Sequence, residues 1–242
     1  MSVPSPRLIH HLFSSPLGNP DKPFVRFSTE LKGHAGPIQK VAFNPVKDSE
    51  LASLSSDGVV RIWDARRQTC SNEIKDLGDA VALTWAPDGT SLVASNRAGT
   101  LYILSPTNQF PLATRENLGV VNDVTFCWTG TRIFAAMDSG RVRILSHPSL
   151  EPAMFLGAGR PWHGDDHDGM DVDENEAPTK PREFMLQGHT SSCLAVEMQP
   201  TARYLATGGA DSLIAFWDTS DWLCLRTSTA MVGPVCSLSG WL

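Results

Sequence analysis

Apolar and polar residues alternate along short segments of this chain, and turn residues separate the segments. One such series consists of Ile38–Phe43, Leu51–Leu54 and Val59–Trp63, with Pro45 and the pair Asp57-Gly58 between them. A period of two is typical of half-buried β-strands, and Gly, Pro, Asn and Asp mark the turns that join them. The chain is therefore expected to be all-β and built from short antiparallel strands.

This series occurs twice in almost the same form. The first copy runs from Gly33-His34 to Trp63-Asp64 and reads GHAGPIQKVAFNPVKDSELASLSSDGVVRIWD. The second copy begins at Gly188-His189 and reads GHTSSCLAVEMQPTARYLATGGADSLIAFWD. A unit of about 40 residues that opens with Gly-His and closes with Trp-Asp is the signature of a WD-repeat β-propeller blade. The pattern predicts an incomplete WD-repeat propeller of about four blades, with fragments of the flanking ones.

Four positions recur in both copies and form two predicted structural tetrads: His34, Ser53, Asp57 and Trp63, and His189, Thr207, Asp211 and Trp217. In such a blade the indole N–H donates to the hydroxyl, the hydroxyl bonds the histidine, and the other histidine nitrogen reaches the aspartate, so that each buried polar group has a partner. A Ser-His-Asp catalytic triad is the alternative, but a triad is recognised by geometry and roles. Recurrence at fixed repeat positions, with Thr in place of Ser, favours the structural role and predicts no catalytic residue.

Two further repeats lack Gly-His and Trp-Asp but keep the rhythm of the strands. Phe43, Trp85 and Phe126 occupy the same position at intervals of 42 and 41 residues, and the next equivalent, Met198, follows 72 residues later. An insertion of about 30 residues reconciles the last interval with a period of 40 to 45. The expected division is an irregular tail over 1–23, blades one to three over 24–158, an acidic disordered insertion over 159–183, and blade four with the first strand of a fifth, Pro234–Leu238, over 184–242.

The expected insertion carries a dense acidic run from Asp165 to Glu176. Carboxylates in DVDENE with His163 and His167 suggest a cation site, but the glycine and the flanking helices of an EF-hand are missing. We therefore expect a solvated acidic loop that attracts a basic partner or mimics nucleic acid, and we expect no metal and no cofactor.

Composition narrows the class of function. A formal charge of −6 disfavours direct binding to nucleic acid, which needs a basic face. Five cysteines without metal-ligand spacing indicate reduced, mostly packed thiols in an intracellular protein. The N-terminal residues show neither a signal peptide nor a membrane anchor. Neither a phosphate-binding loop nor a defined carboxylate pair is present, so we expect no enzyme and no small-molecule substrate.

Several stretches resemble a known family. They are GHAGPIQKVAFNP, SSDGVVRIWDARRQTC, LTWAPDGTSLVASNRAGTLYIL and YLATGGADSLIAFWDTSDWLCLR, followed by GPVCSLS. In the order of intact and degenerate repeats these look like the WD-repeat subunit of the THO complex, THO subunit three. The resemblance implies a non-catalytic scaffold in the nucleus, held by other THO/TREX subunits, that acts in transcription-coupled processing and export of messenger RNA. RNA contact would be indirect, through those partners.

The chain departs from that family, whose members are whole propellers, usually seven-bladed. It lacks most of the blade before residue 24 and everything after the fifth inner strand, so we expect a truncated isoform or an incomplete gene model that is prone to association. The alternative function is a substrate receptor of a cullin-type ubiquitin ligase. Trp63-Asp64-Ala65-Arg66 fits the short WD-x-Arg pattern of such receptors, in which Arg66 would meet the ligase adaptor.

Overall fold

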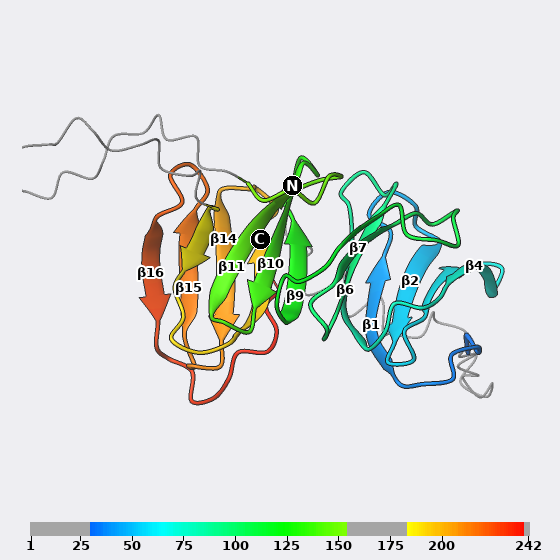
Figure 1. Ribbon diagram of the computed structural model, residues 1–242, viewed down its shortest axis with the longest axis horizontal. Helices are drawn as coiled ribbons and strands as arrows, with labels where there is room; N and C mark the ends of the chain where they lie inside the picture. Colours follow the sequence, from blue (N-terminus) through cyan, green and yellow to red (C-terminus); the bar gives the residue numbers. More distant parts are fainter. Residues whose placement is uncertain (1–29, 154–182, 240–242) are drawn as a thin grey trace, which may run out of the picture.

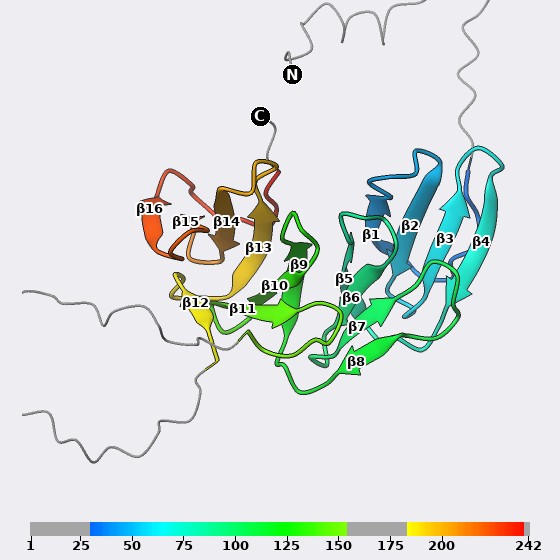
Figure 2. The ribbon, with the colours of Figure 1, turned by 90° about the horizontal axis from the view of Figure 1, so that it is seen from above.

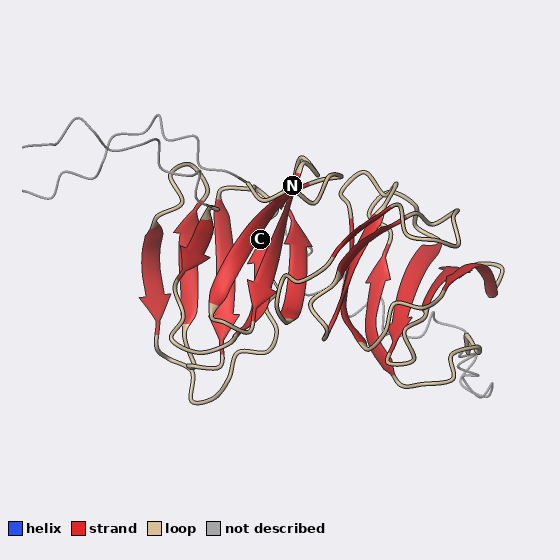
Figure 3. Cartoon of the chain, in the orientation of Figure 1, coloured by secondary structure: helices blue, strands red, loops and turns tan. Residues whose placement is uncertain are grey.

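A computed structural model describes residues 30–153 and 183–239 of the chain. The predicted tail 1–23 and nearly all of the predicted insertion 159–183 lie outside these residues. The described residues form four antiparallel sheets of four strands each and no helix, as Figure 3 shows. No described segment forms a helix long and apolar enough to cross a membrane.

Each sheet follows the order of the chain from its first strand to its last. The first sheet contains β1 (Ile38–Phe43), β2 (Glu50–Ser55), β3 (Val60–Asp64) and β4 (Thr69–Ile74). The second contains β5 (Ala80–Trp85), β6 (Leu92–Asn96), β7 (Leu101–Leu104) and β8 (Ala113–Arg115). The third contains β9 (Val121–Phe126), β10 (Arg132–Met137), β11 (Arg141–Ser146) and β12 (Met185–Gln187). The fourth contains β13 (Cys193–Met198), β14 (Tyr204–Gly209), β15 (Ile214–Asp218) and β16 (Cys224–Ser228).

The four sheets follow one another along an open arc, with the first strand of each sheet on the inner side (Figure 1, Figure 2). The inner strands β1, β5, β9 and β13 contact one another in that order. This is the arrangement of blades around a propeller axis, so the predicted all-β, incomplete propeller is confirmed.

Packing between the sheets explains why their second strands read as nearly continuous apolar or small residues. All five residues of β6 are buried. Val93 packs in a cluster shared with the third sheet, whereas Leu92 and Ala94 pack in a cluster shared with the first. Because neighbours cover both faces, the polar and apolar alternation of a one-sided sheet is lost here. The second sheet therefore depends on both of its neighbours for its burial.

A recurring turn glycine forms the seam between successive sheets. It is found as Gly58, Gly99 and Gly140, each with φ between +77° and +81°. A Cβ on Gly58 would lie 2.5 Å from the carbonyl oxygen of Gly78, and Gly58 accepts a backbone hydrogen bond from Leu77. Gly99 stands in the same relation to Gly119 in the next sheet. Glycine is needed here both for the left-handed conformation and for the close approach of the next sheet.

The predicted division of the chain needs one correction, because the third sheet does not end at residue 158. Its outer strand, β12, follows the acidic segment in the sequence and pairs with β11, with Val142 opposite Leu186. The outer strand of each such sheet precedes the start of the next repeat, which here is Gly188. The acidic segment therefore lies within the third repeat, between its third and fourth strands.

The predicted first strand of a fifth blade, Pro234–Leu238, does not form a strand among the described residues. Val235 donates one backbone hydrogen bond to Gly209, and its side chain lies where a Cβ on Gly208 would be. A strand needs a ladder of such bonds with a neighbour, and this single bond does not make one. The segment instead covers part of the outward face of the fourth sheet.

The first sheet leaves apolar side chains uncovered by described residues. Val41 is 53% and Phe43 66% exposed, whereas Val196, at the equivalent position of the fourth sheet, is 1% exposed against the third sheet. Phe216, Leu223 and Leu225 of the fourth sheet are also exposed. Such faces favour association. The tendency of the isolated chain to associate stays a prediction.

Replacing Gly58 by alanine tests the seam. The substitution places a methyl group against the Gly78 backbone and forces alanine into a positive φ, so we expect it to lower the free energy of unfolding by about 2 kcal/mol. Urea denaturation measures the change. Gly233→Ala is the matched control, because nothing lies within 4 Å of its Cβ position. Equal unfolding midpoints for the two variants would contradict the requirement for glycine at position 58.

Candidate functional site

The fourth sheet holds its four predicted residues in one hydrogen-bonded chain. The indole Nε1 of Trp217 donates to Thr207 Oγ1 at 3.1 Å, and Thr207 Oγ1 lies 2.8 Å from His189 Nε2. His189 Nδ1 lies 3.1 Å from Asp211 Oδ1. An ionised aspartate only accepts, so Nδ1 carries the proton, and the threonine hydroxyl donates to Nε2. Each buried polar atom of this chain then has a partner.

The first sheet brings its four residues together less completely. Trp63 Nε1 donates to Ser53 Oγ at 2.7 Å, and His34 Nε2 lies 2.6 Å from the same oxygen. His34 Nδ1, however, is 3.9 Å from Asp57 Oδ1 and has no hydrogen-bond partner. The expected bond from His34 to Asp57 is therefore absent.

Asp57 binds backbone N–H groups on both sides of the turn. Its carboxylate accepts hydrogen bonds from Ala35 and Gly36, at 3.2 and 3.3 Å, and from Val59 at 3.2 Å. Asp211 accepts the corresponding bonds from Thr190 and Leu213 and still reaches its histidine, so the bond from Gly36 is what distinguishes Asp57. In the first sheet Asp57 joins backbone segments, and the histidine is held through the serine.

Burial and hydrogen bonding act in opposite directions on the pKa of each aspartate. Burial by itself would raise the pKa of Asp211, but hydrogen bonds from the Thr190 backbone and the His189 ring outweigh it and hold the pKa below its usual value. The pKa of Asp57 is lowered in the same way, against burial, by bonds from Ser55 and from backbone N–H groups. Burial lowers the pKa of His34 more than the nearby Asp57 raises it. Both carboxylates are therefore held ionised.

Neither hydroxyl is placed to act as a nucleophile. Ser53 and Thr207 are buried, and each already binds an indole and an imidazole. An acyl-transfer serine needs an exposed oxygen beside a site for the reacting carbonyl. In both sheets these hydrogen bonds join residues of the same sheet, which is a structural role.

Arg66, the predicted partner-binding residue, is exposed in the turn between β3 and β4. Its backbone N–H and that of Arg67 both donate to Asp64 Oδ1, each at 3.0 Å. The aspartate of Trp63-Asp64 therefore shapes the turn, and the turn presents Arg66 to solvent.

The cysteines differ from the prediction that most of them are packed. All five are free, and only Cys193 is buried. Cys70 and Cys224 lie on the outermost strands β4 and β16, where no further strand covers them. Burial raises the pKa of the Cys193 thiol to about 12, which keeps it protonated.

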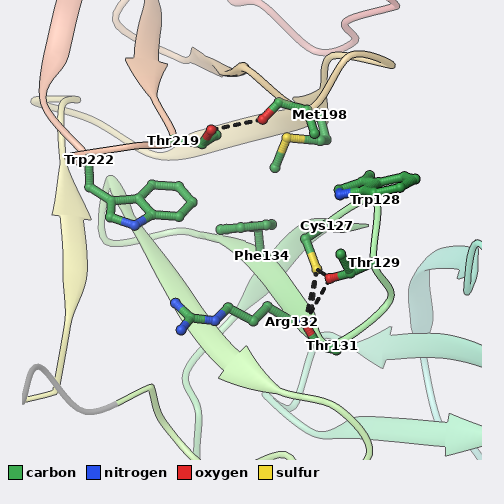
Figure 4. A pocket seen from close by; sticks show the side chains of 10 residues that line it. Cys127, Trp128, Thr129, Thr131, Arg132, Phe134, Met198, Thr219 and Trp222 are labelled. Carbon is green, nitrogen blue, oxygen red and sulfur yellow. Dashed lines mark hydrogen bonds between the residues drawn. The ribbon is translucent and has the colours of Figure 1, made fainter.

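The sequence pattern missed a pocket between the third and fourth sheets, shown in Figure 4. Its volume is about 410 Å³. Phe134 lies between two indoles, Trp128 on one side and Trp222 on the other (Figure 4). Trp128 stands in a turn, Cys127–Gly130, where polar residues are the rule, and this apolar turn residue is the signal that would have found the pocket. Within the described residues no group of His, Cys, Asp or Glu is arranged to hold a metal ion.

The family model described as "WD domain, G-beta repeat" matches residues 25–64 and 180–218. These two stretches end on Asp64 and Asp218 and contain the two predicted sets of four residues. The two intact repeats are therefore WD repeats, which confirms the WD-repeat part of the predicted fold class.

The chain is similar to known proteins over most of its length. It is 33% identical to THO complex subunit 3 of Arabidopsis thaliana, over 87% of this chain and 57% of the relative. It is 29% identical to the WD repeat-containing protein AAC3 of Dictyostelium discoideum, over 89% of this chain and 40% of the relative. The chain thus spans about half of the length of these relatives. The predicted resemblance to THO subunit three is confirmed.

Removing the Thr207 hydroxyl tests whether its hydrogen bonds hold the fourth sheet together. Thr207→Val keeps the shape of the side chain but leaves the Trp217 indole and His189 Nε2 buried without their partner. We expect the free energy of unfolding to fall by about 2 kcal/mol, the typical cost of orphaned buried polar groups. Thermal and urea denaturation measure this change. Thr227→Val, on the exposed outer strand β16, is the control. A similarly small change in the free energy of unfolding for both variants would argue against a structural role of the Thr207 hydrogen bonds.

Acid titration tests Asp211. Because its folded pKa lies below the unfolded value, its stabilising effect is complete above about pH 4 and is lost as the pH falls through the folded pKa. We expect Asp211→Asn to be less stable than wild type at pH 7 and to lose less stability between pH 7 and pH 3. Urea midpoints across that range measure the difference. The exposed Asp48→Asn variant should follow wild type, and parallel curves for Asp211→Asn and wild type would disprove the assignment.

Proposed function

We propose that this chain is a non-catalytic protein-interaction scaffold and a subunit of the THO/TREX assembly, acting in transcription-coupled processing and nuclear export of messenger RNA. The observation that carries the proposal is the similarity to THO complex subunit 3 across 87% of this chain, including the degenerate second and third repeats. A likeness limited to the two intact repeats would indicate only a WD-repeat fold, which hosts many functions.

The arrangement of polar groups supports a scaffold. In the described residues the recurrent histidine, hydroxyl and indole groups bind one another and leave no reactive group at an open site. The sheets are hydrogen-bonded and packed on one another, and the turns between their strands stand on the surface, where binding residues are usually carried. A scaffold needs this combination of a packed frame and exposed turns.

The charge of the chain supports an indirect relation to RNA. At −6 the whole sequence has no excess of cations to neutralise a phosphate backbone. We place RNA contact on partner subunits and the chain in the nucleus, where a THO subunit would act.

Affinity capture from nuclear extract tests the proposal. A tagged form of the chain should retain other THO subunits at moderate salt, and should retain them after nuclease treatment, because the contacts are between proteins. Recovery of the chain without any THO subunit under these gentle conditions would overturn the assignment.

The exposed turn at Arg66 separates this function from that of a ubiquitin-ligase receptor. If the chain is a THO scaffold, Arg66→Ala should capture the same THO subunits as wild type, with Arg67→Ala as the matched neighbour. If the chain is a ligase receptor, wild type should capture a cullin adaptor, and Arg66→Ala should lose it. Mass spectrometry of the three captures decides between the two functions.

A further inference from the structure

The pocket between the third and fourth sheets has an apolar floor and an exposed aromatic wall. Phe134 is buried at the floor, and its ring lies 5.4 Å from that of Trp222. Trp128, in the turn between β9 and β10, is 68% exposed although it borders the pocket. An indole left largely in water beside an open apolar pocket is typical of an interaction surface.

Trp222 reaches the pocket through a turn that recurs in the repeats. Gln68 in the first sheet, Leu150 in the third and Trp222 in the fourth all follow the third strand of their sheet and have φ between 57° and 60°. The left-handed conformation is disfavoured for bulky side chains. The turn itself belongs to the repeat, but the fourth sheet places a tryptophan in it, and that tryptophan lines the pocket.

The polar groups of the pocket include one cation without a counter-charge. Among residues 30–153 and 183–239, no carboxylate forms an ion pair with the Arg132 guanidinium. The nearby hydroxyls of Thr129 and Thr131 bind each other at 2.8 Å, and that of Thr219 donates to the Ala202 carbonyl at 2.8 Å. Figure 4 shows the Arg132 side chain extending past Phe134 toward Trp222. Within the described residues, a positive charge without a counter-charge therefore stands on the Trp222 side of the pocket.

We propose that this pocket binds a short peptide of a partner protein that presents an aromatic side chain next to carboxylates. The aromatic side chain would lie over Phe134 between Trp128 and Trp222, and a carboxylate would pair with Arg132. This inference rests on the proposed scaffold function and names the chemistry of one of its partners.

The size and charge of the pocket favour this occupant. A volume of about 410 Å³ lies in the range of small-ligand pockets and admits one aromatic side chain with its neighbours. Arginine pairs with carboxylates through a planar fork, and tryptophan and arginine are enriched where binding energy concentrates. A basic peptide would meet Arg132 with like charge.

Fluorescence anisotropy of a labelled synthetic peptide tests the proposal. The probe carries one tryptophan flanked by glutamates, and the matched probe carries lysines in place of the glutamates. Wild type should bind the acidic probe about tenfold more tightly than the basic one, and Arg132→Glu should reverse the order. Arg141→Glu is the control, because Arg141 is exposed at the opposite end of the third sheet. Trp128→Ala should lower the affinity for the acidic probe by about tenfold.

Four outcomes would overturn the proposal. The first is no saturable binding of the acidic probe to wild type, and the second is equal binding to wild type and Arg132→Glu. The third is saturable binding of single-stranded RNA that Trp128→Ala removes while the peptide fails to bind, because this assigns the pocket to base stacking. The fourth is binding of the acidic probe only to the double variant Asp165→Asn, Asp166→Asn and not to wild type. This would mean that the acidic segment of the chain itself occupies the pocket.

The test is independent of the THO assignment. Failure of the peptide to bind leaves capture of THO subunits intact, because those contacts can use other turns. If the capture fails, the peptide can still bind, and the pocket would then serve a scaffold of another assembly.

Discussion

The structure depends on one constraint: where the middle strands of a sheet are buried, every polar group on them needs a partner inside the protein. Thr207 meets this constraint by joining an indole and an imidazole, and Ser53 does the same in the first sheet. The second sheet meets it differently. Asn96 donates to the Leu77 carbonyl and accepts from the Thr100 backbone. A repeat without the recurrent residues thus gives its buried polar groups other partners, here from nearby backbone.

Contacts between sheets repeat this logic at longer range. Trp85 of the second sheet donates to the Ala42 carbonyl on β1, and Asn122 of the third donates to the Cys193 carbonyl on β13. Lys40 on β1 also pairs with Asp123 on β9, 3.1 Å away, which links the first and third sheets along the inner side of the arc. The order of the sheets is therefore fixed by many small contacts between neighbours.

The same constraint bears on function. Buried residues in the middle strands are committed to holding the sheets, and the residues left for binding are those of the turns, the strand ends and the outer strands. Trp128 and Trp222 border the pocket from turns, Arg132 borders it from the first residue of the middle strand β10, and Arg66 lies in a turn. A scaffold of this kind keeps its frame and its binding surface in separate parts of each repeat, so one can vary without the other.

The repeat, most of its strands and the recurrent residues could be predicted from the sequence, because a period of two and a unit of about 40 residues are local properties of the chain. The remaining features depend on contacts between segments far apart in the sequence. The tertiary structure placed Met185–Gln187 in the third sheet, since strand pairing joins segments on either side of the acidic run. It left Asp57 3.9 Å from His34 Nδ1, whereas the same residue types in the fourth sheet come within 3.1 Å of each other, a difference that the sequence pattern does not encode. It brought Trp128 and Trp222 to one pocket, because that pocket exists only where two sheets meet.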